Sequence, residues 1–205
     1  ASQEVFVLDP SPDSLHLAQQ RANEIEHSNK VHFISDWKDL PQRLDLVIIA
    51  TNANVRENVT KTLLENYQVN FLVLEKVLFQ ALESFSIIGN LIEKNKVPTW
   101  VNHPRRMFAS YKMLKEKMAE KVPRIYQVVG GNWGLACNAL HFIDLFEYLS
   151  GATLFSLDVS RVDNEIQPSK REGFIEFTGT INGCLNDGSH FSITKGNKQN
   201  GSIFK

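Results

Sequence analysis

The feature of this sequence that most constrains its fold is a regular alternation of strand-like and helix-like segments in the first half. The strand-like runs are short and mostly apolar, and they occupy residues 4–8, 31–34, 45–50, 70–75 and 98–102. Runs that are apolar throughout are typical of strands covered on both faces. Strands joined by helices of this length need crossover connections, which build a parallel sheet. The first half therefore predicts an α/β domain with a doubly wound parallel sheet over residues 1–102.

Two of the expected helices show their buried faces in the sequence. Ser11 and Pro12 predict the start of the first helix, because serine caps a helix N-terminus and proline is tolerated at its first position. Its expected inner stripe consists of Leu15, Ala18, Ala22 and Ile25. The expected inner stripe of the helix at 54–67 consists of Val55, Val59 and Leu63. Both sets follow the helical period, so we expect them to face the sheet.

The second half has a different pattern from about Pro123 onward. Strand-like segments occupy residues 124–133, 153–162, 173–183 and 189–194, several with alternating polarity. The Asp-Gly pair at 187–188 is typical of a tight turn between antiparallel strands. One apolar helix, at 132–151, interrupts the strands. We therefore expect an α+β domain with a largely antiparallel open sheet over residues 103–205, joined to the first by a helix at 104–120.

Composition excludes several classes of protein. The 205 residues are 42% hydrophobic with a formal net charge of -1, which gives no broad electrostatic surface for nucleic acid. Two cysteines without a regular pattern favour a reducing compartment over a disulfide framework. No apolar run reaches the ~20 residues of a membrane helix, and the N-terminus does not resemble a signal peptide. We expect a soluble cytoplasmic protein.

The strand ends hold the candidate cofactor residues, because ligands of such a sheet bind beyond the carboxyl ends of its strands. Asp9 follows the first strand directly, where a carboxylate accepts hydrogen bonds from ribose hydroxyls and repels a 2′-phosphate. It predicts NAD in preference to NADP, although an Asp-Pro pair is also common in turns. Thr51, Asn52 and Asn54 follow the strand at 45–50, where small and amide residues let the backbone approach a cofactor. Asn54 is equally suited to cap the next helix.

Glu75 and Lys76 end the apolar strand at 70–75, where charges are costly unless they are paired or used. One interpretation is a salt bridge at a strand end. The other is that Lys76 lies beside a nicotinamide, hydrogen-bonds a substrate hydroxyl and helps to remove its proton.

The helix at 132–151 places Cys137, His141 and Asp144 on one stripe, at spacings of four and three residues. They either form a row of reactive groups or are structural, with Cys137 acting as a small hydrophobe and His141 paired to Asp144. A zinc site with Cys184 or His190 is a weaker alternative, and we expect no metal.

A glycine-rich G-x-G-x-x-G loop, which would hold a pyrophosphate after the first strand of a Rossmann sheet, does not occur before Asp9. We expect that the first strand and its loop are missing from this chain, and that the chain is also cut short at its C-terminal end.

Together these segments resemble the Gfo/Idh/MocA family of oxidoreductases, which includes glucose-fructose oxidoreductase and inositol dehydrogenase. The resemblance rests on "VFVLDPSPDSL", "DLVIIATNANV", "VLEKV", "VNHPRRMFASYKMLK" and "ALHFIDLFEYLSG". It implies a Rossmann-like dinucleotide-binding domain and a second domain whose sheet mediates a homo-dimer or homo-tetramer. It also implies hydride transfer between NAD, or less readily NADP, and a sugar, nucleotide-sugar or cyclitol.

The resemblance assigns roles to particular residues. Lys76 matches the lysine of the family's Glu-Lys-Pro motif, and His141 matches its catalytic histidine. Asn102, Arg105 and Arg106 match the strand exit that shapes the cofactor and substrate cleft. Asn102 and Arg105 are therefore candidate substrate-binding residues.

The sequence departs from the family pattern at two positions. Val77 replaces the proline of the motif, and Cys137 stands where many dehydrogenases of the family have aspartate. A neutral thiol does not stabilise an imidazolium as a carboxylate does. Asp144, one turn after His141, is a candidate substrate-binding carboxylate from the other side along the helix. These departures leave open a catalytically inactive sugar- or nucleotide-binding regulatory relative.

Overall fold

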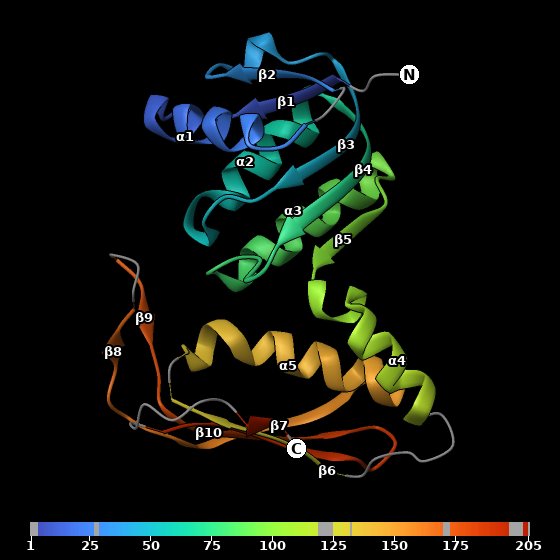
Figure 1. Cartoon of the computed structure of the whole chain (residues 1–205), viewed down its shortest axis with the longest axis vertical. Coiled ribbons are helices and arrows are strands. Elements are labelled where there is room, and N and C mark those ends of the chain that lie inside the picture. Colours follow the sequence, from blue (N-terminus) through green and yellow to red (C-terminus); the bar gives the residue numbers. More distant parts are fainter. Residues whose placement is uncertain are drawn as a thin grey trace.

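The computed structural model of the chain describes residues 4–26, 29–118, 125–131, 133–169 and 173–196, and the backbone of 203–204. Its first and second halves lie in the upper and lower parts of Figure 1, and a separate cluster of buried side chains forms the core of each. One includes Leu72, Leu74 and Ile88 from the first half, and the other includes Leu145 and Phe146 from the second half. Two cores accord with two domains, and the boundary at residue 102 stays our interpretation.

The first half alternates strands and helices as predicted. Its elements are β1 (Glu4–Leu8), α1 (Pro12–Asn23), β2 (Lys30–Ile34), η1 (Trp37–Asp39), β3 (Arg43–Ile49), α2 (Ala53–Asn66), β4 (Gln68–Glu75), α3 (Leu82–Asn95) and β5 (Thr99–Asn102). Every strand pairing in this half is parallel. These strands are joined by helices, so the α/β class with parallel sheets is confirmed.

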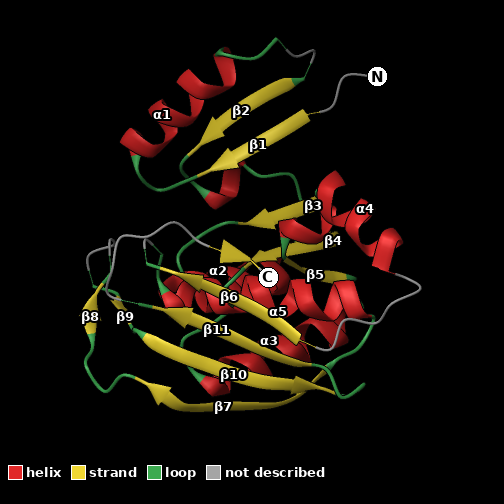
Figure 2. Ribbon diagram, turned by 60° about the horizontal axis from the view of Figure 1, so that its bottom comes forward, coloured by secondary structure: helices red, strands yellow, loops and turns green. Residues whose placement is uncertain are grey.

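The parallel strands form two separately hydrogen-bonded groups instead of one continuous sheet. One group is β1-β2 and the other is β3-β4-β5 (Figure 2). Among the described strands, β1 and β3 each have one edge without a neighbour. In the usual dinucleotide-binding order, the first strand lies between the positions that β1 and β3 occupy here.

The helix boundaries follow the local signals, and the inner stripes follow them only in part. Ser11 caps α1 by accepting a hydrogen bond from the Ser14 N–H, and Pro12 is the first residue of the helix, as predicted. The inner stripes were wrong at two positions, because Ile25 lies beyond the end of α1 at 69% exposure and Val55 is 43% exposed. In α2 the side chains that face the core include Arg56 instead.

The second half consists of helices packed on one sheet. Its elements are η2 (Pro104–Met107), α4 (Ala109–Met118), β6 (Ile125–Gly130), α5 (Leu135–Ser150), β7 (Leu154–Val162), β8 (Gln167–Pro168), β9 (Ile175–Glu176), β10 (Gly179–Leu185), β11 (His190–Lys195) and β12 (Ile203–Phe204). The main sheet has the order β12-β6-β11-β10-β7. It is antiparallel except between β6 and β11, so it is a mixed sheet that is largely antiparallel.

The α5 helix lies along one face of this sheet, and its buried side chains supply most of the second core (Figures 1 and 2). Gly151 ends the helix in the left-handed conformation at φ 73°, as expected for a glycine C-cap. Leu140, an apolar residue of this helix, is 39% exposed. The predicted helix at 104–120 is divided into η2 and α4, and its last two residues lie outside the described part. No described helix is both long and apolar enough to cross a membrane.

Candidate active site at the end of β4

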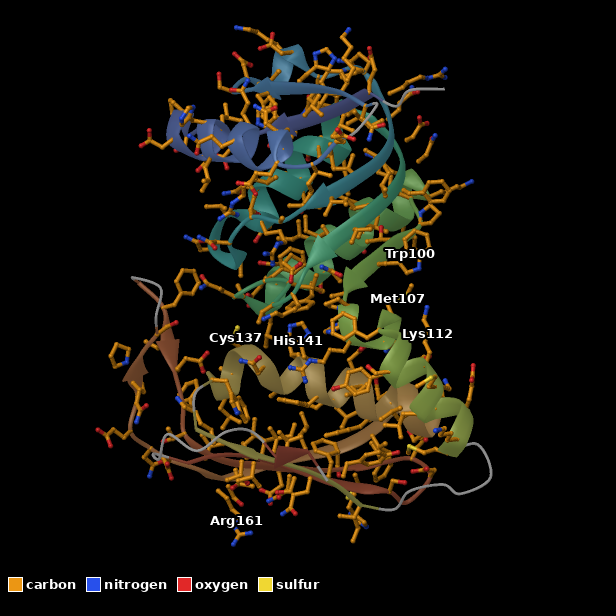
Figure 3. The ribbon with its side chains drawn as sticks, viewed as in Figure 1. Trp100, Met107, Lys112, Cys137, His141 and Arg161 are labelled. Carbon is orange, nitrogen blue, oxygen red and sulfur yellow. The ribbon has the colours of Figure 1, made fainter. Side chains whose placement is uncertain are left out.

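The carboxyl end of β4 and the first turn of α5 meet at a direct contact between the two halves. The Lys76 Nζ donates to the Cys137 backbone oxygen at 2.9 Å and lies 3.0 Å from the Cys137 Sγ. His141 is one helical turn further along α5. Figure 3 shows Cys137 and His141 on the side of α5 that faces the N-terminal strands. The structure therefore brings the predicted lysine and histidine to one site.

Neighbouring strands hold the base of this site. Glu75 and Asn102 are register partners on β4 and β5, and the Asn102 amide donates to the Glu75 Oε2 at 2.8 Å. The peptide bond between Lys76 and Val77 is cis. Glu75 makes no salt bridge to Lys76 among the described residues, so the strand-end salt bridge that we considered is not formed.

His141 is held in its neutral form at neutral pH. Burial, followed by the positive charges of Lys76 and Arg105, lowers the pKa of His141 to about 4, and Glu75 opposes this shift. His103 lies across from it with ring centroids 5.6 Å apart in an edge-to-face arrangement. Burial also lowers the pKa of His103. The Nδ1 atoms of both rings are buried without a hydrogen-bond partner in the described structure.

Asp144 pairs with a different residue from the one expected. Arg106 donates to both of its carboxylate oxygens, with a 2.9 Å bond from the Arg106 Nε to the Asp144 Oδ2. This two-point ion pair joins η2 to α5. The suggested pairing of His141 with Asp144 is therefore wrong. Since both carboxylate oxygens are engaged, a substrate role for Asp144 would require sharing them with Arg106.

Arg56 is a central residue of the site that sequence reasoning missed. Its side chain is 2% exposed, and its guanidinium donates to the backbone oxygens of Thr51, Val77 and Leu78, the last at 2.9 Å. These bonds tie the loop after β3 to the loop after β4, which carries Lys76. The spacing of Arg56, Thr60 and Leu63 on α2 was the available signal. An arginine is seldom fully buried, so this spacing alone does not predict that Arg56 faces the core.

Glu176 is a second residue that sequence reasoning missed. It is 8% exposed, and its carboxylate accepts hydrogen bonds from the Ala136 N–H at 2.9 Å and the Cys137 N–H at 3.2 Å. It thereby caps the N-terminus of α5, where the N-cap residue Gly134 has no side chain to do so. No sequence signal could have found it, because the acceptor lies about 40 residues from the donors.

The predicted cofactor residues lie at the ends of β1, β3 and β4. Asp9 accepts a 2.8 Å hydrogen bond from the Ser11 N–H, so it forms the turn that we had considered as its alternative role. The Thr51 Oγ1 is buried without a partner in the described structure, and Asn52 is the N-cap of α2. Asn54 lies exposed within the first turn, so its suggested role as the helix cap is wrong.

These positions fit part of a nicotinamide dinucleotide. Asp9 directly follows β1, Thr51 lies two residues after β3, and Lys76 directly follows β4 and contacts Cys137 of α5. The sequence contains no G-x-G-x-x-G loop that would hold the pyrophosphate. The fit therefore covers the ribose and nicotinamide ends of the cofactor.

The described histidine, cysteine and acidic side chains do not form a metal site. Among the described residues, no three histidine, cysteine or acidic side chains are close enough to hold a metal ion. Cys184 and His190 pair at 2.9 Å across β10 and β11, on elements other than α5, which carries Cys137 and His141. The zinc alternative that combined these residues is therefore not supported.

Comparison with known proteins supports the fold. No family model matches the chain, and no curated protein matches it in sequence. Many solved structures match the chain in fold. The super-repressor mutant of Gal80p from Saccharomyces cerevisiae has a TM-score of 0.74 at 16% identity, over 98% of this chain and 62% of that one.

Two further solved structures contain a bound nicotinamide cofactor. WlbA from Chromobacterium violaceum, in complex with NADH and UDP-GlcNAcA, has a TM-score of 0.68 at 19% identity, over 96% of this chain and 60% of that one. GenD2 from gentamicin A biosynthesis, in complex with NAD, has a TM-score of 0.71 at 14% identity, over 98% of this chain and 60% of that one. This chain thus has the fold of Rossmann-type dehydrogenases, as its resemblance to the Gfo/Idh/MocA family predicts, and spans about three fifths of these structures.

Proposed function

We propose that this protein is an NAD(P)-dependent oxidoreductase that transfers a hydride between a nicotinamide cofactor and a hydroxyl-bearing carbon of a sugar, nucleotide-sugar or cyclitol. The single observation that carries the proposal is the meeting of Lys76 with the first turn of α5, one turn before His141. A strand-end amine and an imidazole next to a nicotinamide position are the groups that an alcohol oxidation needs. The bound nicotinamide ring supplies or accepts the hydride.

The residues of the chain supply the proton chemistry. The Lys76 amine donates a hydrogen bond to the reacting oxygen and polarises it. His141, neutral at neutral pH, accepts the hydroxyl proton in the direction of oxidation. Its low pKa makes it a weak base, because general bases work best with a pKa near the working pH. Asn102 positions Glu75, and Arg56 positions the loop that carries Lys76.

The cofactor preference rests on Asp9. A carboxylate at the end of β1 favours the free ribose hydroxyls of NAD and disfavours the 2′-phosphate of NADP. The NADH and NAD in the WlbA and GenD2 structures support a nicotinamide cofactor. The UDP-GlcNAcA bound to WlbA supports a nucleotide-sugar among the substrate classes.

We also propose that two or four copies associate through the main sheet of the second half. Ile125 and Val129, 75% and 41% exposed, alternate along β6 with the buried Tyr126 and Val128. They therefore lie on the sheet face opposite α5. Light scattering after size-exclusion chromatography measures the mass. A monomer at micromolar concentration would contradict this proposal.

A catalytically inactive regulatory protein is the second candidate function. Cys137 lies beside Lys76 where many dehydrogenases of the family have aspartate, and the carboxylate of Asp144 is paired with Arg106 instead of His141. The similarity to Gal80p, whose structure is that of a super-repressor mutant, also favours this candidate.

The test measures reduced-nicotinamide absorbance with a panel of sugars, cyclitols and nucleotide-sugars. Lys76→Ala and His141→Ala should each abolish turnover of a true substrate, whereas Lys112→Ala, which removes an exposed lysine of α4, should leave the rate unchanged. If the unaltered protein binds NAD and a sugar but never changes that absorbance, the regulatory function stands instead. Activity that survives Lys76→Ala would contradict the proposed mechanism.

A further inference from the structure

A hollow of about 490 Å³ lies on the flank of α5, beside the candidate active site. Its volume is within the range of ~300 to 1,000 Å³ that is typical of small-molecule sites. Its lining residues come from η2, α4, β6 and α5 and from the segments that connect them: Arg105, Phe108, Ser110, Tyr111, Val128, Trp133, Asn138 and Phe142. On α5 the lining residues are Asn138 and Phe142, which point to a different side of the helix from Cys137 and His141.

Four aromatic side chains line the hollow. Phe108 and Tyr111 stack with ring centroids 6.3 Å apart, and Trp133 packs on Phe142 at 5.5 Å. Flat apolar walls of this kind bind a ring by burying its faces. The hollow therefore suits a small ring better than a flexible chain.

Arg105 places a positive charge in this aromatic lining. Its guanidinium carbon lies 4.0 Å above the centre of the Phe142 ring, and burial lowers the pKa of the group. Arginine stays charged in proteins. Among the described residues, Arg105 makes no ion pair, and none of the residues lining the hollow is acidic. A half-buried charge without a counter-ion favours a negatively charged ligand and repels a cationic one.

The adjacent arginine shows that the chain does pair such charges elsewhere. Arg106 is next in sequence on η2 and is neutralised by the two-point bond to Asp144. Asn138 also leaves one group for a ligand, because its Nδ2 donates to the Gly134 oxygen at 2.9 Å while its Oδ1 remains an acceptor. The hollow thus offers one cation, one acceptor and aromatic walls.

We propose that this hollow binds a small ring compound that carries an anionic group, a carboxylate or a phosphate. The anion pairs with the Arg105 guanidinium, and the ring lies against Trp133 and Tyr111. The resemblance made Arg105 a candidate substrate-binding residue, and we assign it instead to this hollow, whose lining includes neither Lys76 nor His141. The proposed binding does not depend on the hydride chemistry proposed above.

The test is calorimetric titration of the protein with benzoate and phenyl phosphate, and with glucuronate and glucose 6-phosphate. Benzyl alcohol and glucose are the neutral counterparts, and acetate is the anion without a ring. We expect the ring anions to bind, and the stronger of the carboxylate and phosphate members identifies the anionic group. Arg105→Gln should weaken this binding at least about tenfold, as expected for loss of a charge-assisted hydrogen bond. Lys112→Gln removes an equal charge from exposed α4 and should change it less than about twofold.

Asn138→Asp provides a second variant that adds a negative charge to the lining with almost no change in shape. It should also weaken binding of the ring anions and spare the neutral compounds. Equal binding of neutral and anionic compounds, unchanged affinity in Arg105→Gln, or no binding of any ring anion would each overturn the proposal. A protein that binds benzoate but oxidises nothing contradicts only the proposed enzyme. An active enzyme that binds none of these anions contradicts only the anion pocket.

Discussion

Replacing Cys137 with aspartate tests whether the site lacks only a carboxylate. Cys137 precedes His141 by one turn of α5 and contacts the Lys76 amine at 3.0 Å. An aspartate there would lie next to both groups. It would oppose the positive charge of Lys76, which is one of the causes of the low His141 pKa. We therefore expect Cys137→Asp to raise the pKa of His141.

The size of this rise follows from the helix geometry. Side chains four residues apart on a helix have Cβ atoms about 5–6 Å apart. Two unit charges about 6 Å apart interact by roughly 2.8 kcal/mol at an effective dielectric constant of ~20. That energy corresponds to a shift of about two units in the pKa. Cys137 is exposed, so solvent screening reduces the effect, and we expect a rise of about one pH unit from the value of about 4.

The assay is an NMR titration of the His141 ring protons in the protein as it stands and in two variants. Cys137→Asn is the matched control, because it has the shape of aspartate without the charge. If His141 is the base of a dehydrogenase, turnover near pH 7 should also rise several-fold in Cys137→Asp, since the pKa moves toward the working pH. Equal His141 titration in the aspartate and asparagine variants would refute the electrostatic reasoning.

Two further predictions concern stability. Arg56→Met leaves three backbone oxygens without their donor, so we expect chemical denaturation to show a loss of about 3 to 5 kcal/mol in the free energy of unfolding. Arg21→Met on the exposed side of α1 should change it by less than about 0.5 kcal/mol, and equal effects would contradict the role of Arg56. The second prediction is that stability falls as pH drops from 6.5 to about 4, because the unfolded chain protonates His141 at the ordinary value while the folded protein does not. The difference between the folded and unfolded pKa of His141 limits this loss of stability to about 3 kcal/mol. Chemical denaturation at each pH measures the free energy of unfolding, and His141→Gln should make it depend less on pH in this range.

Much of the local structure could be predicted from the sequence, because it depends on neighbouring residues. The apolar run at 4–8 matches β1, and the capping serine at Ser11 starts α1 where predicted. Gly151 ends α5 for the same kind of local reason, its freedom to adopt a positive φ. The order of strands and helices then predicted the parallel class of the first half.

The buried faces were harder to predict than the elements themselves. Val55 fits the helical period yet is exposed, whereas Arg56, the next residue, is almost completely buried. An arginine can be buried there only because the loops after β3 and β4 bring three backbone oxygens to its guanidinium. That arrangement depends on the folded sheet, so the helical spacing of Arg56 with Thr60 and Leu63 could indicate its burial but not its partners.

For the candidate site too, some features could be predicted from the sequence and others depend on the tertiary structure. The sequence by itself determined which reactive groups stand at the strand ends and along α5, because strand ends and helix stripes follow from residue spacing. Only the tertiary structure decided their partners. It placed Lys76 against Cys137 across 61 residues, gave Asp144 to Arg106 instead of to His141, and closed the N-terminus of α5 with Glu176. The physical reason is that an ion pair or a hydrogen bond acts over a few ångströms, and only the packing of the folded chain brings residues so distant in sequence that close.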